Sequence, residues 1–244
     1  MSSHARRDPI SSARGLVADQ FGDARSAILA GSVVTGGATD ASDLDIVVIG
    51  DDPSAPSRAS LNYGGWPAEV FIHNEETIHG FWGRKDERLR PALALMCARG
   101  EIVVDKDGSG ARMQAEARAH LATGPPELSA EDHQRMRYGL TDSLDDFLAD
   151  PGTEELPFIV AALTRALCEV AMENRKAFRG SGKWMYRMAR EADERFADEL
   201  SAAIQAAGAG ERAPLAALAR SELEAAGGPL FDGYKADGRP LLTD

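Results

Sequence analysis

The segments of this chain that are typical of β-strands all lie before two consecutive prolines, Pro125 and Pro126, and only helical patterns follow them. Short runs rich in Val and Ile predict strands within residues 26–32, 43–50, 68–74 and 101–108. Apolar residues at helical spacing predict helices over about residues 10–21, 88–99 and 111–121. The chain therefore divides into a part with a sheet and a part without one.

We expect an α+β protein with two domains. Residues 1–125 would form a domain around a small mixed sheet, and residues 126–244 an all-α helical bundle rich in Ala, Leu, Glu and Arg. The helices predicted for the second domain cover about residues 129–149, 153–179, 183–206 and 211–226. Their expected N-caps include Ser129, Thr153 and Ser181. The Gly- and Asp-rich stretch 227–244 is expected to be irregular.

Charge limits the partners that such a chain would bind. Its 244 residues include 27 Lys and Arg against 39 Asp and Glu, a formal charge of −12. Residues 126–244 contain 14 basic and 22 acidic side chains, a net charge of −8. A surface this acidic repels nucleic acid phosphates and attracts small cations. We therefore expect no nucleic acid partner and a small cationic ligand.

No apolar window is long enough for a membrane span, and the first twelve residues lack the apolar core of a secretory signal. These features predict a cytoplasmic protein without a membrane partner. Cys97 and Cys168 lie in apolar helical contexts and are expected to be buried without forming a disulfide. The sequence leaves open whether the protein is a monomer or a homodimer.

The segment 30–50 carries the most informative chemistry. Gly31 and Ser32 end a strand, a turn rich in Gly, Thr and Asp follows, and Ser42-Asp43-Leu44-Asp45 opens the next strand. Alternate side chains of a strand share a face, so Asp43 and Asp45 project together. Two carboxylates in this arrangement can hold a divalent metal ion. The glycine at 31 permits close backbone approach, and the turn offers donors for phosphate oxygens.

A third carboxylate follows in the next strand. Glu69 is the only acid of the run 67–72, which we expect to pair with the strand of Asp43 and Asp45. Three carboxylates on neighbouring strands can hold two magnesium ions, which would activate a hydroxyl and neutralise a triphosphate during in-line transfer. His73, just after this strand, is the histidine most expected beside the site.

Together, Gly31-Ser32, the spacer with Gly36-Gly37, Ser42-Asp43-Leu44-Asp45 and the later Glu69 resemble the signature of the DNA polymerase β-like nucleotidyltransferases. The two-part plan looks most like the aminoglycoside adenylyltransferases of the 3''/9 type, which add a C-terminal helical bundle. Residues 100–108 resemble the strand and turn that close the sheet in this family. The motifs cover about residues 30–108, together with Gly182-Lys183-Trp184, and the match in the helical half is weak.

The resemblance implies roles for individual residues. Asp43 and Asp45 would bind both metals, and Glu69 would be the third ligand and accept the proton of the acceptor hydroxyl. Ser32 and Ser42 would contact the triphosphate, beside Gly31. Lys183 would reach the nucleotide phosphates from the helical half. The implied reaction moves AMP from ATP, with two Mg²⁺ ions, to a hydroxyl of a small molecule such as an aminoglycoside, held in a cleft between the halves.

Other interpretations remain open. The chain could be an antitoxin-like or regulatory member that acts by binding, or a transferase that modifies a protein or an RNA. An Asp-x-Asp pair and a lone Glu are also common on solvated strands. Two charged clusters have both a functional and a solvated interpretation. One contains Arg175, Lys176, Arg179, Lys183 and Arg187, which could meet a triphosphate; the other contains Asp142, Asp145, Asp146, Glu154 and Glu155, which could meet an aminosugar.

Overall fold

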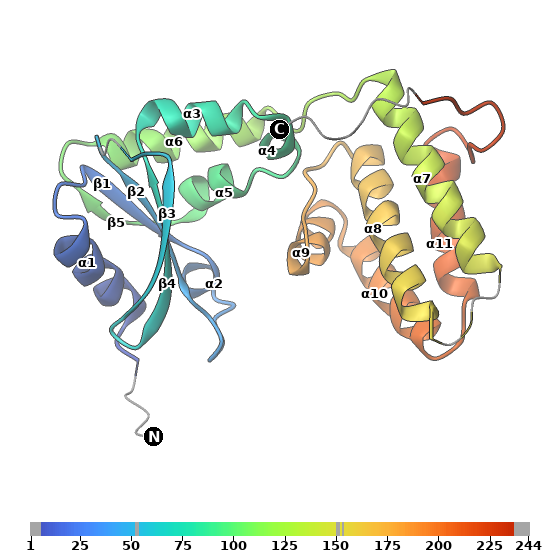
Figure 1. The fold of residues 1–244 in the computed structure, drawn as a ribbon, viewed down its shortest axis with the longest axis horizontal. Helices are drawn as coiled ribbons and strands as arrows, with labels where there is room; N and C mark the ends of the chain where they lie inside the picture. Colours follow the sequence, from blue (N-terminus) through green and yellow to red (C-terminus); the bar gives the residue numbers. More distant parts are fainter. Residues whose placement is uncertain (1–5, 52–53, 150–151, 153, 237–244) are drawn as a thin grey trace. The chain divides into compact units, whose positions relative to one another are not determined.

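The computed structural model describes residues 6–51, 54–149, 152 and 154–236 (Figure 1). The chain divides into two compact units, Met1–Gly124 and Pro125–Asp244, each with its own buried core. The first unit contains the sheet and the second contains helices. This is the α+β architecture that the sequence predicts.

The described part of the first unit contains a mixed five-stranded sheet, with strand order β3-β4-β2-β1-β5. Its strands are β1 (Ser26–Ala30), β2 (Leu44–Ile49), β3 (Ser57–Tyr63), β4 (Trp66–His73) and β5 (Glu101–Asp105). The pair β2 and β4 is parallel, whereas the other neighbours are antiparallel. Neither strand of the parallel pair is at an edge of the sheet, so each has a hydrogen-bonded neighbouring strand on both sides.

Helices cover the two faces of this sheet (Figure 1). One face packs against α1 (Pro9–Gln20), through an apolar cluster that includes Leu16, Leu44 and Ile46. The other face packs against α3 (Glu75–Trp82), α5 (Ala92–Arg99) and α6 (Ser109–Ala122). Val47 and Ile49 enter that second cluster, so successive residues of β2 alternate between the two cores.

Three short helices and one strand of this unit differ from expectation, and one of these helices, α3, was not predicted. The predicted helix 88–99 is two helices, α4 (Lys85–Leu89) and α5, separated by Arg90 and Pro91. A four-residue helix, α2 (Ser32–Thr35), follows β1 directly. Strand β3 was not predicted, because its residues alternate between partly buried and exposed positions and few of them are large and apolar.

The second unit consists of helices over its described residues. These are α7 (Ala130–Leu148), α8 (Leu156–Asn174), α9 (Lys183–Ala192), α10 (Glu194–Gly208) and α11 (Ala213–Ala225). Their shared core contains Leu140, Phe147, Leu163, Leu167 and Leu215, all fully buried. The described residues after Gly228 have no helix or strand, as predicted for this stretch.

Capping explains where these helices begin. Ser129 caps α7 by accepting a hydrogen bond from the backbone N–H of Asp132 at 3.0 Å, as predicted. The predicted helix 183–206 is interrupted at Asp193, whose carboxylate accepts from Phe196 N at 3.0 Å and caps α10. Gly182 occupies the N-cap position of α9, so the prediction of Ser181 was wrong. Thr153 lies outside the described residues.

Both cysteines are buried and free of disulfides, as expected. Burial raises the pKa of Cys97 to about 12 and that of Cys168 to about 11, so both side chains are neutral thiols at neutral pH. Within the part of the chain that the structure describes, none of the helices combines the length and apolarity needed to cross a membrane.

Candidate metal and nucleotide site

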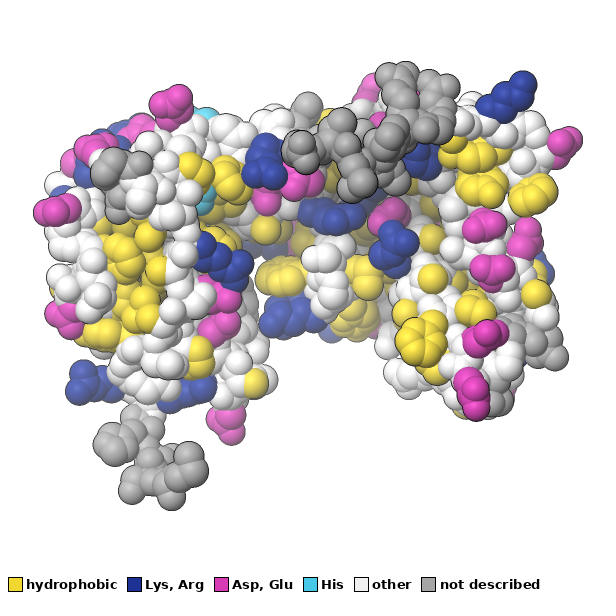
Figure 2. All heavy atoms as spheres, viewed as in Figure 1, with side chains coloured by type: hydrophobic (Ala, Val, Ile, Leu, Met, Phe, Trp, Pro, Cys, Tyr) yellow, Lys and Arg dark blue, Asp and Glu magenta, His cyan; other side chains and the backbone are white. Residues whose placement is uncertain are grey.

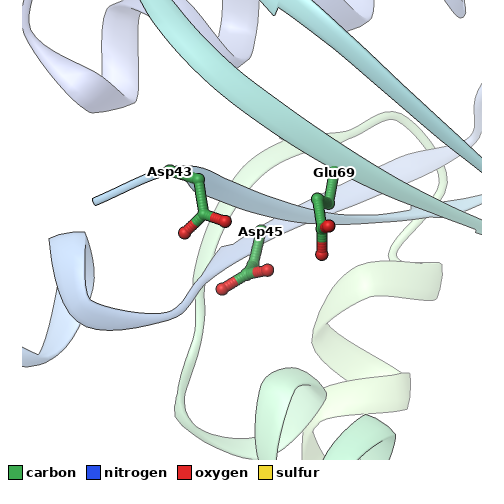
Figure 3. A group of neighbouring side chains, drawn as sticks. All are labelled: Asp43, Asp45 and Glu69. Carbon is green, nitrogen blue, oxygen red and sulfur yellow. The ribbon is translucent and has the colours of Figure 1, made fainter. Parts of the chain in front are cut away.

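Three carboxylates of the first unit lie together at one end of the parallel strand pair. Asp43 immediately precedes β2, Asp45 is the second residue of β2, and Glu69 lies in β4. One oxygen from each lies within 4.8 Å of the others, and all three side chains are half-buried. Figure 3 shows the three side chains projecting from two neighbouring strands toward a common space. The structure thus brings together the three acids singled out by the sequence.

Strand register produces this convergence. In the parallel ladder of β2 and β4, Asp45 lies opposite Glu69. Leu44 and Ile46 are fully buried against the α1 face, so Asp45 and Glu69 must project from the other face. Further along that face, Val47 enters the core beneath α3, α5 and α6. The carboxylates therefore lie where this apolar core ends, partly shielded from water and still accessible.

Gly31 lies directly beside Asp45, at a position that favours glycine. Its backbone has φ 79° and ψ −164°, a conformation that is open almost only to glycine. A Cβ atom at Gly31 would also overlap with Oδ2 of Asp45. The glycine is therefore required both by its backbone conformation and by the space that the Asp45 carboxylate occupies.

Ser42 connects the turn before β2 to the start of α2 through hydrogen bonds of its side-chain hydroxyl. Its hydroxyl lies 2.9 Å from the Ser32 hydroxyl and accepts a hydrogen bond from Thr39 N at 2.9 Å. The residue is only 7% exposed, whereas Ser32 is half-buried. The geometry gives Ser42 an internal role in ordering the turn, and contacts of Ser32 and Ser42 with a triphosphate remain predictions.

Two arginines contact Glu69 and Ser42 from segments that sequence reasoning did not consider for the site. Arg58 of β3 forms an ion pair with Glu69, and Arg6 donates from Nη1 to the carbonyl oxygen of Ser42 at 3.2 Å. The Arg6 guanidinium also lies 4.5 Å from the ring centroid of Trp66. Neither arginine is part of a motif, so no sequence spacing pointed to it.

His73 is not beside the carboxylates, and that expectation was wrong. It ends β4, four residues beyond Glu69, which corresponds to roughly 13 Å along a strand. The ring is buried, and its Nδ1 lies 3.2 Å from the Thr77 hydroxyl. Burial lowers the pKa of His73, so the side chain is neutral at physiological pH and serves the packing of α3.

The basic cluster of the second unit is largely neutralised within that unit. Arg175 pairs with Asp193 and Glu222, and Lys176 and Arg179 both pair with Glu173. Three of the five cations therefore serve the bundle itself. Lys183 is exposed at the first position of α9, and its contact with a nucleotide remains a prediction.

The donor set suits a hard divalent cation. Mg²⁺ prefers oxygen ligands, and the cluster offers carboxylate oxygens alone. Among the described residues, this is the one group of three His, Cys, Asp or Glu side chains that is close enough to share an ion. The half-buried position leaves room for further oxygen ligands from a substrate. Asp43, Asp45 and Glu69 would hold the metal.

Comparison with known proteins agrees with this geometry. A family model described as "Nucleotidyltransferase domain" matches residues 10–90, and the chain has no match among curated proteins. A crystal structure of a nucleotidyltransferase-like protein from Exiguobacterium sibiricum 255-15 shares 14% sequence identity, with a TM-score of 0.42. That match covers 89% of this chain and 77% of the other. Residues 10–90, which include all three carboxylates, thus match a nucleotidyltransferase domain.

Proposed function

We propose that this protein is a magnesium-dependent nucleotidyltransferase that moves AMP from ATP to a hydroxyl of a small molecule and releases pyrophosphate. The observation that carries the proposal is the convergence of Asp43, Asp45 and Glu69 within a region that matches a nucleotidyltransferase domain. When bound, two Mg²⁺ ions would supply charge neutralisation to the triphosphate and lower the pKa of the attacking hydroxyl.

The proposed roles follow from where each side chain lies. Asp43 and Asp45 would hold both metals, because they project together from the start of β2. Glu69 lies across the strand pair and would serve as the third ligand and accept the proton of the acceptor hydroxyl. Gly31 would let the triphosphate approach the backbone closely, with Ser32 donating its hydroxyl.

A small cationic acceptor, such as an aminoglycoside, is the substrate class we propose. The support is the resemblance of the motifs and the net charge of −8 on residues 126–244. Figure 2 shows acidic side chains spread over the visible face of the second unit. The acids of this unit singled out from the sequence are all exposed, namely Asp142, Asp145, Asp146, Glu154 and Glu155. Exposed carboxylates can bind the ammonium groups of an aminosugar.

A direct test measures pyrophosphate release by the purified full-length protein with Mg²⁺, each nucleoside triphosphate and a panel of aminoglycosides. Asp45→Asn keeps the size of the side chain and removes a metal ligand, so transfer should fall by at least about a thousandfold. Asp40→Asn is the matched control, because Asp40 is exposed in the preceding turn and outside the carboxylate cluster. It should retain wild-type turnover.

The outcomes separate the parts of the proposal. Turnover with a different hydroxyl compound and with none of the aminoglycosides would refute the proposed acceptor class. It would leave the proposed transferase activity standing. Wild-type turnover in Asp43→Asn, Asp45→Asn and Glu69→Gln would refute the metal site. Binding of metal and nucleotide without transfer to any acceptor would favour the alternative of an antitoxin-like or regulatory protein that acts by binding.

A further inference from the structure

We propose that Arg58 is a positioning residue for Glu69, and that its guanidinium competes with a divalent cation for the Glu69 carboxylate. The inference rests on the metal site of the proposed function. It concerns a residue outside the acidic motif, on the strand at the edge of the sheet. Its consequence is that the free site binds a cation less tightly than its three carboxylates alone would.

The position of Arg58 follows from the β3 and β4 ladder. Arg58 lies opposite Phe71, and Ser60 lies opposite Glu69, so Arg58 is the diagonal neighbour of Glu69 on the same face. A long side chain bridges this diagonal, and the guanidinium of Arg58 forms an ion pair with Oε2 of Glu69. The guanidinium also lies 4.8 Å from the ring centroid of Phe71, which restricts its orientation.

This ion pair engages a group that the proposed chemistry needs. A carboxylate has two oxygens, and a guanidinium on one of them fixes the plane in which the other can reach a metal. The positive charge of Arg58 also offsets one of the three negative charges of the cluster. A cation entering between Asp43, Asp45 and Glu69 is therefore repelled by Arg58 and must share Glu69 with it.

The chain contains a matched control for this arrangement. Arg84 pairs with Asp86 at 3.5 Å, and its guanidinium lies 4.8 Å from the ring centroid of Phe81. Its side chain is 55% exposed, against 54% for Arg58. Arg84 thus has the same kind of ion pair and ring contact, but its carboxylate partner lies outside the metal cluster.

The test is the affinity of the full-length protein for Mn²⁺ without nucleotide, measured by electron paramagnetic resonance of the free ion. We expect Arg58→Gln to bind Mn²⁺ about three to ten times more tightly than wild type, because one competing charge is removed. Arg58→Lys keeps the positive charge but lacks the planar guanidinium, so its Mn²⁺ affinity should lie between those of wild type and Arg58→Gln. Arg84→Gln should bind as wild type does.

Wild-type or weaker Mn²⁺ binding by Arg58→Gln would overturn the proposal, as would an equal gain in Arg84→Gln. If Arg58→Gln does not fold, Arg58→Lys takes its place, and wild-type or weaker Mn²⁺ binding by Arg58→Lys would overturn the proposal. Glu69→Gln separates this failure from failure of the metal site itself. Weaker Mn²⁺ binding in Glu69→Gln with no change in Arg58→Gln refutes the role of Arg58 alone, whereas unchanged binding in Glu69→Gln refutes Glu69 as a ligand.

Discussion

Replacing Gly31 with alanine should damage both the stability of the first unit and its capacity to bind a divalent metal. The backbone conformation of Gly31, φ 79° and ψ −164°, is strained for any residue with a Cβ atom. The added Cβ would also overlap with Oδ2 of Asp45. The Asp45 side chain can rotate more easily than the backbone around residue 31 can shift. We therefore expect the Asp45 carboxylate to move away from Asp43 and Glu69.

The two effects have different magnitudes. Holding a non-glycine residue in such a backbone region costs about 1 to 3 kcal/mol of folding free energy. Each kcal/mol lowers the melting temperature of a domain of this size by roughly 4 °C. Disturbing a neighbour that orients a metal ligand typically weakens metal binding by about 10- to 100-fold. Gly31→Ala should therefore melt several degrees lower and bind Mn²⁺ at least about tenfold more weakly.

Two nearby glycines separate backbone strain from displacement of Asp45. Gly36 has φ 80°, but a Cβ there would meet nothing within 4 Å. Gly37 has an equally open site and no positive φ. Gly36→Ala should lower the melting temperature while leaving the Mn²⁺ affinity unchanged, and Gly37→Ala should change neither quantity.

Thermal unfolding and Mn²⁺ titration of the three variants form the assay. Wild-type Mn²⁺ affinity in Gly31→Ala would refute the argument that Gly31 makes room for the Asp45 carboxylate. An equal loss of affinity in Gly36→Ala would refute it as well, because the effect would then follow from backbone strain in the turn.

Three further predictions concern stability, each measured by urea unfolding. Asp193→Ala should destabilise the protein by about 1 to 2 kcal/mol by uncapping α10, and Asp193→Asn should cost less because Asn also caps helices. Ser42→Ala should cost about 1 kcal/mol, since its hydroxyl joins Thr39 N and Ser32. Burial lowers the pKa of His73 from 6.5, so the unfolded chain binds more protons than the folded protein as the pH falls through about 6.5, and stability should fall from there down to the lower pKa of the folded state. His73→Gln should reduce that fall, and an unchanged pH dependence would contradict it.

The acidic site could be predicted because it depends on short-range rules. Alternation along one strand places Asp43 and Asp45 on one face whatever the rest of the fold does. Buried Leu44 and Ile46 then fix which face that is, and the apolar run Val70-Phe71-Ile72 after Glu69 predicts the partner strand. The strands can each be recognised from residues that are close in sequence, whereas the pairing of β2 with β4 is a contact between segments farther apart in the chain.

Helix boundaries were less predictable where the same residue types serve two purposes. The stretch around Asp193 reads as continuous helix, because Glu, Ala, Asp and Arg all occur within helices. The structure shows that Asp193 caps α10 and also pairs with Arg175 of an earlier segment. The tertiary partner that favours a break at this residue is not visible in the local pattern.

The contacts of Arg58 with Glu69 and of Arg6 with Ser42 could not be predicted, because each is made by a long side chain from a segment without a motif. Arg58 lies eleven residues before Glu69, and Arg6 lies thirty-six residues before Ser42. Arg58 also belongs to β3, an edge strand whose polar outer residues suit an exposed edge and hide its strand character. Once β3 is paired with β4, the diagonal from Arg58 to Glu69 follows from the register. The acids of the cluster could thus be found from their spacing along the chain, whereas the ion pair of Arg58 with Glu69 could be found only from the sheet topology.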